Sequence, residues 1–136
     1  MLKHYDISGV DFSSAGEASS SFKSVLKKLG IRSEIVRKVA IAMYEAEINT
    51  VIHGGGGSCD AEILKDCIKI TFSDNGPGIA DIDLAMKEGY STASERIREL
   101  GFGAGMGLPN IKKYSDDMQI RTEKGKGTTV VLTINL

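Results

Sequence analysis

The chain has 136 residues, 41% of them hydrophobic and 26% charged, with a formal net charge of -1, which fits one globular domain with a single core. The balanced charge argues against nucleic-acid binding, which favours a basic excess on one face, and no apolar run approaches the roughly 20 residues of a membrane span. The N-terminus lacks the apolar core of a signal peptide, and Cys59 and Cys67 show no metal-ligand spacing, so we expect free thiols in a cytoplasmic protein.

The first half of the chain predicts one strand and two helices. Alternation favours a strand over Lys3–Val10, and Ser13 or Ser14 could cap a helix that runs to about residue 28 and that Gly30 closes. A stronger helix is predicted over Ser33–His53, where apolar residues recur at intervals of three and four. Residues four positions apart on this second helix are therefore expected to share one face.

The second half of the chain combines short apolar runs with glycine-rich turns, which predicts short strands, hairpins and short helices. The expected elements are strands over Ala61–Leu64 and Cys67–Phe72, helices over Ile82–Glu88 and Pro109–Tyr114, and strands over Gln119–Thr122 and Thr128–Leu136. Because strands and helices segregate in this way, we predict an α+β fold, a two-layer sandwich that forms a single domain over residues 1–136.

Glu45 and Asn49 are four residues apart on the strong helix, about 40° from each other around its axis. An amide oxygen at this place could hold a hydrated Mg²⁺ together with substrate phosphates, because Mg²⁺ prefers oxygen ligands and keeps several waters. A carboxylate beside it could take a proton from an attacking hydroxyl group. Taken alone, however, the pair is more simply explained by a solvated glutamate and a surface asparagine.

The segment DNGPGI, Asp74–Ile79, directly follows an apolar strand. An aspartate that closes a strand can direct its carboxylate at the amino group of a purine, and Gly76 and Gly78 let the backbone pass close to a flat ring. The same residues would equally satisfy a tight turn in which the aspartate binds its own backbone. Both interpretations stay open for this segment when it is taken alone.

The segment GFGAGMGLPN, Gly101–Asn110, matches neither standard phosphate-loop pattern. G-x-G-x-x-G would require its third glycine at Met106 or Leu108, and the Walker loop would require Lys after Gly107. Alternating glycines still leave backbone N–H groups free to turn toward an anion, and a helix that begins near Pro109 would add its positive end. The segment therefore fits either a lid over a triphosphate or a mobile surface loop.

The last segment, GKGT at Gly125–Thr128, is explained most simply by a hairpin turn. Thr128 and Thr129 could still face a ligand from the last strand.

Taken in order, these segments resemble the GHKL nucleotide-binding superfamily of gyrase, heat-shock chaperone, mismatch-repair and histidine-kinase ATPases. The resemblance covers roughly residues 33–136. The N-box E-x-x-x-N, the G1 box D-x-G-x-G, the glycine-rich lid and the G-x-G-T-T motif match Glu45–Asn49, Asp74–Gly78, Gly101–Leu108 and Gly125–Thr129 respectively. The short chain, the IHG after the N-box and the GYST before the lid resemble the anti-sigma factor serine/threonine kinases in particular.

This resemblance implies a Bergerat-type fold with a mixed, mostly antiparallel sheet and helices on one face, and it implies ATP and Mg²⁺ as cofactors. Glu45 would be the general base that activates a serine hydroxyl group of a partner protein, and Asn49 would supply an oxygen to Mg²⁺. Asp74 would accept a hydrogen bond from the adenine amino group, with Thr129 in the same pocket. The residues that would wrap the nucleotide are Gly76, Gly78, Gly101, Gly103, Gly105, Met106, Gly107 and Leu108.

The implied activity is phosphorylation of a STAS-type anti-sigma antagonist in a bacterial partner-switching module. The resemblance also allows a sigma factor or a phosphatase regulator as a second partner, and a homodimer, but no nucleic acid and no membrane. The alternative is a nucleotide-dependent switch that sequesters a sigma factor or another regulator without turnover. We do not expect the ATP-binding domain of a histidine kinase, because no helical phosphoacceptor segment precedes the expected fold.

Three features depart from the pattern or need a separate account. The insertion SERIREL, Ser94–Leu100, carries arginines that could contact phosphate, although a solvated extra helical turn is the interpretation we favour. The run Gly54–Gly57 is expected to lengthen the loop after His53, a residue that we expect to close its helix. Glu47 lies about 160° around the helix from Glu45, so we do not expect it to share the role of a base.

Overall fold

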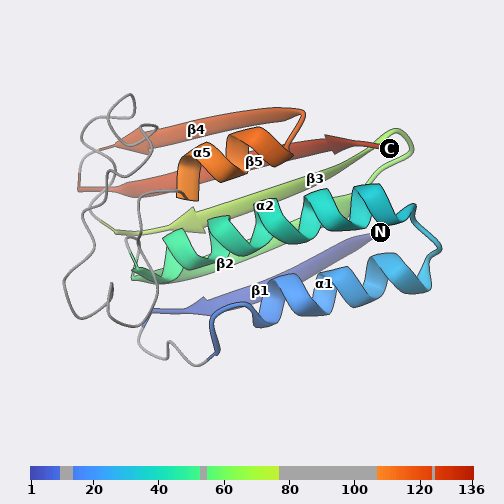
Figure 1. The fold of residues 1–136 in the computed structure, drawn as a ribbon. Coiled ribbons are helices and arrows are strands. Elements are labelled where there is room, and N and C mark those ends of the chain that lie inside the picture. The colour runs from blue at the N-terminus through green and yellow to red at the C-terminus, as the bar shows by residue number, and fades with distance from the viewer. Residues whose placement is uncertain (10–13, 53–54, 77–106, 124) are drawn as a thin grey trace.

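The fold has two layers, a β-sheet and a set of helices that cover one face of it (Figure 1). The computed structural model describes residues 1–9, 14–52, 55–76, 107–123 and 125–136. Within these ranges the predicted two-layer α+β architecture is confirmed. The predicted features that lie outside them are Val10, Ser13, His53, Gly54, Gly78, the helix over Ile82–Glu88, the segment Ser94–Leu100, Gly101, Gly103, Gly105 and Met106.

The sheet has five strands in the order β1-β2-β3-β5-β4. All neighbouring strands pair antiparallel, so the mostly antiparallel sheet that we predicted contains no parallel pair among the described strands. The strands are β1 (Leu2–Ser8), β2 (Gly56–Ile63), β3 (Cys67–Asp74), β4 (Asp117–Glu123) and β5 (Gly127–Asn135).

Strand β2 begins at Gly56, five residues before the predicted start at Ala61. Gly57 lies opposite Asp74 of β3, and a Cβ atom added to Gly57 would lie 1.9 Å from the carbonyl oxygen of Ser73. Glycine is therefore required because the two strands approach closely here. The prediction that the whole glycine run forms a loop is wrong for Gly56 and Gly57, which are strand residues.

In the described part of the chain, three helices lie side by side on the sheet, with α2 between the other two (Figure 1). They are α1 (Glu17–Lys28), α2 (Ser33–Ile52) and α5 (Gly107–Tyr114). Helix α1 ends as predicted, because Gly30 follows it with a φ of 75°, and Pro109 lies in the first turn of α5 as expected.

The start of α1 differs from the prediction. The residue before the helix is Gly16, and no side chain of its own segment caps it. The carboxylate of Glu47 accepts a hydrogen bond from the backbone N–H of Gly16 at 2.9 Å, and Ser13, one of the two expected caps, lies outside the described residues. A group from another helix thus satisfies the free N–H groups that a local serine would otherwise bind.

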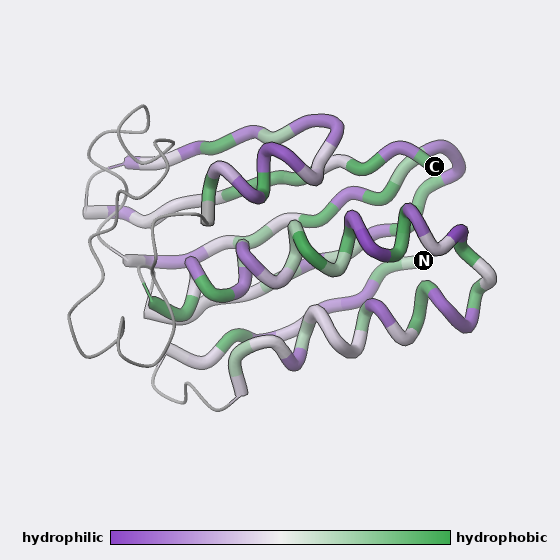
Figure 2. Tube along the Cα trace, viewed as in Figure 1, coloured by the Kyte–Doolittle hydropathy of each residue, from purple (hydrophilic) through white to green (hydrophobic). Residues whose placement is uncertain are grey.

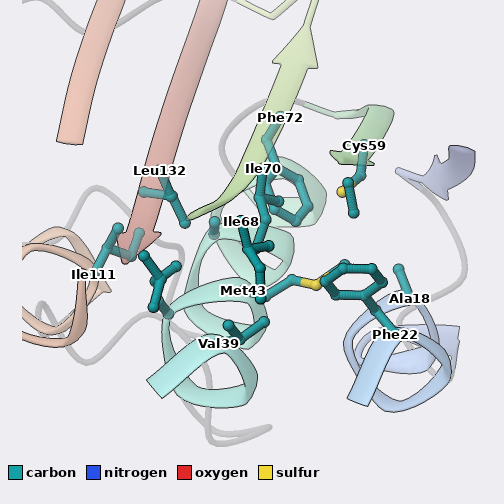
Figure 3. Close-up of a cluster of buried hydrophobic side chains, with 14 of the residues drawn as sticks. Ala18, Phe22, Val39, Met43, Cys59, Ile68, Ile70, Phe72, Ile111 and Leu132 are labelled. Carbon is teal, nitrogen blue, oxygen red and sulfur yellow. The ribbon is translucent and has the colours of Figure 1, made fainter. Parts of the chain in front are cut away.

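The hydrophobic core lies between the sheet and the helices. Figure 2 shows apolar residues that recur along the helices and alternate along the strands. In Figure 3, Met43 of α2 lies against Phe22 of α1, and Ile111 of α5 lies close to Leu132 of β5; all four side chains are 0% exposed. Burial of each such side chain contributes roughly 1.5–3 kcal/mol, which fixes α2 and α5 against the sheet.

The other face of the sheet is polar. Alternate residues of β3 and β5 on this face, including Thr71, Ser73 and Thr129, are half-buried. Their neighbours Phe72 and Val130 point toward the helices and are buried. No helix in the described ranges combines the length and the apolar character that crossing a bilayer requires.

Candidate active site

Ends of four elements gather at one end of the sandwich. The C-terminal ends of α2 and β3 lie there beside the N-terminal ends of α5 and β5 (Figure 1). The predicted site residues that the structure describes are Glu45 and Asn49 on α2, Asp74 and Gly76 at the end of β3, Gly107 and Leu108 at the start of α5, and Thr129 on β5. Segments that lie far apart in the sequence therefore meet at this end.

Glu45 and Asn49 are both half-buried on α2. Helix α5 packs against α2, and the side chain of Asn110 on α5 is near enough to the Glu45 carboxyl group to affect its pKa. Asn49 follows one helical turn later, about 40° around the axis, and so lies on nearly the same side. The two residues therefore share nearly the same side of α2.

Burial raises the pKa of the Glu45 carboxyl group, and the hydrogen bond with Asn110 acts in the opposite direction and lowers it. A carboxylate that is partly removed from water holds a proton more readily than an exposed one. The pKa of such a group lies closer to neutral pH, which suits a general base. A raised pKa is thus the direction that suits the predicted role of Glu45 as a general base.

Glu47 has a different role, as its position on the helix predicted. It is 2% exposed, and it points toward the N-terminus of α1. Its Oε2 atom accepts hydrogen bonds from the backbone N–H groups of Gly16 and Ala18, and its Oε1 atom accepts one from Ser19. Glu47 thus anchors α1. It is not available to share the predicted role of Glu45 as a base on the other side of α2.

The Asp74 carboxylate is held in a defined orientation. Its Oδ1 atom accepts hydrogen bonds from the backbone N–H of Gly76 at 2.9 Å and from that of Thr128 at 3.2 Å. The first of these is the turn interaction that the sequence allowed as the simpler explanation. Among the described residues, the other oxygen, Oδ2, makes no hydrogen bond, so it can accept one from a ligand.

The close approach of β5 to Asp74 depends on Gly127. This residue has a φ of 106°, and a Cβ atom added to it would lie 2.1 Å from the carbonyl oxygen of Asp74. A side chain there would push the start of β5 away from the end of β3. Gly127 thus permits the contact between Thr128 and the Asp74 carboxylate.

Thr128 and Thr129 lie on opposite faces of β5, as neighbouring strand residues do. Thr128 is 9% exposed, and its hydroxyl oxygen lies 3.0 Å from that of Thr122. The Thr129 hydroxyl oxygen instead lies 3.5 Å from that of Ser73, on the polar face of the sheet. The structure thus places Thr128 beside Asp74, rather than the Thr129 that we predicted there. The buried Val130 and the strand period could have identified Thr128 from the sequence.

Helix α5 begins at Gly107, the last glycine of the alternating segment. Leu108 and Ile111 are 7% and 0% exposed and anchor the helix in the core. Asn110, between them, contacts Glu45, although the sequence analysis gave this residue no role. No pattern within this segment indicates the contact, because it depends on how α5 packs against α2.

Known proteins share this sequence pattern. A family model described as "Histidine kinase-, DNA gyrase B-, and HSP90-like ATPase" matches residues 33–136. The serine/threonine-protein kinase RsbT of Bacillus subtilis is 30% identical over 112 residues, which cover 79% of this chain and 78% of the relative. An anti-sigma F factor of Clostridium perfringens is 30% identical over 125 residues, 86% of this chain and 84% of the relative.

Solved structures share the fold. The structure of the RsbU and RsbW domains of Rv1364c from Mycobacterium tuberculosis aligns with a TM-score of 0.68 and 16% identity, over 98% of this chain and 32% of that longer chain. The SiaB–SiaC complex from Pseudomonas aeruginosa aligns with a TM-score of 0.64 and 10% identity, over 97% of this chain and 88% of that chain. At these identities the likeness shows the fold alone.

Proposed function

Because the chain belongs to the family of histidine kinase-, DNA gyrase B- and HSP90-like ATPases, we propose that it is an ATP-dependent serine/threonine protein kinase of the anti-sigma regulatory type. The relatives named RsbT kinase and anti-sigma F factor support this choice within the family. The observation that carries the proposal is the half-buried Glu45 carboxylate, which lies one helical turn from Asn49 at the same end of the fold as Asp74.

In the proposed reaction, the γ-phosphoryl group of ATP moves to a serine or threonine hydroxyl group of a partner protein. The bond between the β,γ-bridging oxygen and the γ-phosphorus breaks, a bond from the hydroxyl oxygen to that phosphorus forms, and ADP leaves. Glu45 accepts the hydroxyl proton. General-base catalysis of this kind contributes about 10²–10⁴-fold, and the rest of phosphoryl transfer depends on positioning and charge neutralisation.

The adenine pocket is proposed around Asp74. Its Oδ2 atom would accept a hydrogen bond from the adenine amino group, because Oδ1 is already bound by two backbone N–H groups. Thr128 stands beside this carboxylate, so we give it the role that the sequence resemblance gave to Thr129. Gly76, Gly107 and Leu108 lie at the same end. The residues that stay predicted contacts with the nucleotide are Gly78, Gly101, Gly103, Gly105 and Met106.

Asn49 is the residue that would hold Mg²⁺, bound together with ATP. Its amide oxygen is a hard, neutral ligand, and it is half-buried on α2. Among the described residues, no group of three or more His, Cys, Asp or Glu side chains could hold a metal ion, which suits an ion that takes most of its ligands from phosphate and water. When bound, Mg²⁺ would neutralise phosphate charge during transfer.

We propose a small STAS-type antagonist protein in the cytoplasm as the substrate, and a sigma factor as a second partner. The similarity to anti-sigma F factors supports a regulator that works through protein partners. It also supports a second candidate function, in which nucleotide-dependent binding of a partner occurs without turnover. Glu45 favours the kinase, because a pure binding protein does not need a partly buried carboxylate beside Asn49.

The deciding experiment incubates the protein with γ-labelled ATP, Mg²⁺ and a candidate STAS-type partner. The wild type is expected to transfer label, and Glu45→Ala to lose transfer while it retains ATP binding. Glu34→Ala is a matched control, because Glu34 is an exposed glutamate in the first turn of the same helix. Tight, nucleotide-dependent partner binding without transfer by the wild type would establish the binding switch instead.

A further inference from the structure

We propose that His4, Asp6 and Asp60 form a pH-sensitive clasp, which joins the edge strand β1 to β2 while His4 is an imidazolium ion and weakens when His4 loses its proton. Among the described strands, β1 pairs with β2 alone and forms one edge of the sheet (Figure 1). An edge strand is attached on one side only, so each contact across that side matters to its attachment. This inference concerns the N-terminal strand and does not depend on the proposed kinase activity.

His4 lies directly opposite Asp60 in the antiparallel pair of β1 and β2. Met1 and Ile63 exchange two backbone hydrogen bonds, at 2.8 and 3.3 Å, and hydrogen-bonded and non-hydrogen-bonded pairs alternate along the ladder from there. His4 and Asp60 therefore form a non-hydrogen-bonded pair, in which opposite side chains lie closest. Both side chains are on the polar face of the sheet, because Cys59, the neighbour of Asp60, is buried toward the helices.

Each ring nitrogen of His4 contacts a carboxylate. The Nδ1 atom lies 2.6 Å from Oδ1 of Asp60, and the Nε2 atom lies 3.1 Å from Oδ1 of Asp6. An ionised carboxylate can only accept a hydrogen bond, and a neutral imidazole has a single N–H group, so one carboxylate would face a nitrogen lone pair. Only the imidazolium ion can donate to both oxygens. The geometry therefore fits the protonated state of His4.

The other charged side chains around His4 are also acidic. Glu62 of β2 lies diagonally across from His4 on the same face of the sheet. Glu17 of α1 and Glu47 of α2 line a cavity that His4 lines as well. These surroundings favour a positive charge on the imidazole ring rather than opposing it.

His4 is the only cation among the described residues that forms an ion pair with Asp6 or Asp60. Lys3 and Tyr5, its neighbours in the sequence, point to the opposite face of the strand. The side chain of Asp6 is 92% exposed and that of Asp60 is 48% exposed, so water and salt screen the contact with Asp6 more strongly. The contact with Asp60, which crosses between the strands, is therefore the more important of the two.

The two contacts determine the pH range in which the clasp acts. The hydrogen bond with Asp60, and after it the one with Asp6, raises the pKa of His4 above its ordinary value of 6.5. The clasp thus contributes its full stability below pH 6.5, and this contribution is lost as the pH rises through the raised pKa of the folded state. Strand β1 is therefore held more firmly in mildly acidic than in alkaline solution.

The first test measures the protonation of His4 directly. The chain has two histidines, and the loss of signals in His4→Gln assigns the ring signals of His4 in an NMR titration. The midpoint is expected above pH 6.5, with a proton on both ring nitrogens below it. Asp60→Asn is expected to lower the midpoint more than Asp6→Asn does. Asp66→Asn, which changes an exposed aspartate between β2 and β3, should leave it in place. A wild-type midpoint at or below pH 6.5, or an unchanged midpoint in Asp60→Asn, would overturn the proposal.

The second test is a double-mutant cycle, which measures how much the charged contact stabilises the fold at each pH. Urea denaturation gives the equilibrium constant of unfolding for the wild type, His4→Gln, Asp60→Asn and the double variant. At about pH 6, the combined effect is expected to be about twofold to fivefold smaller than the product of the single effects, as for an exposed cross-strand pair. At about pH 9 this factor should approach one, because His4 is then neutral. The combination of His4→Gln with Asp66→Asn should give a factor near one at both pH values. No coupling of His4 with Asp60 in acid, or equal coupling in acid and alkali, would overturn the clasp.

Discussion

The carboxylate of Glu47 accepts hydrogen bonds from both the backbone N–H and the hydroxyl group of Ser19, the former at 3.0 Å. Two further backbone N–H groups, of Gly16 and Ala18, bind its other oxygen. A single buried side chain of α2 therefore caps α1, and its negative charge lies at the positive end of that helix. The helix that carries Glu45 and Asn49 on one side thus holds α1 with its other side.

Replacement of Glu47 is predicted to destabilise the fold. Glu47→Ala leaves buried N–H groups of α1 without a partner, and we expect the free energy of unfolding to fall by about 3 kcal/mol or more. Urea denaturation followed by circular dichroism measures the change. Glu17→Ala, which removes an exposed glutamate from the first turn of α1, is expected to cost less than about 1 kcal/mol. Similar losses in the two variants would contradict the capping role.

Asp74→Asn is predicted to weaken ATP binding by at least about tenfold. The carboxamide oxygen can still accept from the N–H groups of Gly76 and Thr128, which keeps the turn. Its NH₂ group then faces the adenine amino group, so that two donors oppose each other. Calorimetric titration with ATP measures the affinity. An unchanged affinity would show that the adenine pocket lies elsewhere.

The two neighbouring threonines are predicted to differ in their effect on nucleotide binding. Thr128→Val keeps the backbone N–H that binds Asp74 but removes the hydroxyl group that contacts Thr122, and we expect ATP affinity to fall between about twofold and tenfold. Thr129→Val has the same change of shape on the polar face of the sheet, so ATP affinity should stay the same. A larger loss of ATP affinity in Thr129→Val than in Thr128→Val would show that Thr129, and not Thr128, lies in the adenine pocket.

These sites show what the sequence could predict and where it could not. Local periodicity located the helices and most strands, since Val39 and Met43 recur at a helical interval and Ile68, Ile70 and Phe72 alternate. Gly56 and Gly57 carry no such pattern, because a glycine in a strand is selected by the close approach of its neighbours, which is a tertiary property. The role of Glu47 as a cap depends in the same way on a helix more than 25 residues away in sequence.

In the candidate site, too, some residues could be identified from local sequence patterns and others depend on tertiary packing. Glu45, Asn49 and Asp74 stand in short ordered motifs, so the sequence could identify them. The contact of Asn110 with Glu45 depends on how α5 packs on α2, and no spacing within one segment encodes it. The choice between Thr128 and Thr129 depends on which face of β5 turns toward the helices, and here the alternation with the apolar Val130 and Leu132 is a signal within the sequence.

Glu45→Gln is predicted to stabilise the folded protein at neutral pH. Burial raises the pKa of the Glu45 carboxyl group in the folded state, so folding disfavours its ionised form. Below the ordinary pKa of 4.5, the protonated Glu45 carboxyl group contributes to the stability of the folded protein. This contribution is lost as the pH rises through the raised pKa of the folded state. The variant should therefore show a higher Tm than the wild type at pH 7, and the difference should shrink in acid. A lower Tm of Glu45→Gln than of the wild type at pH 7 would contradict this prediction.

The same raised pKa predicts the pH dependence of phosphoryl transfer. Glu45 must be ionised to accept the hydroxyl proton, so kcat should fall as pH decreases through a pKa above the ordinary value of 4.5. Asn110→Ala should move this acid limb to higher pH, because the hydrogen bond from Asn110 lowers the pKa of Glu45. Lys112→Ala should leave the limb in place. Steady-state rates across the pH range measure the limb, with ATP affinity followed in parallel so that a loss of binding is not mistaken for protonation of the base. If the residual activity of Glu45→Gln shows the same fall of kcat at low pH, the group that titrates is not Glu45.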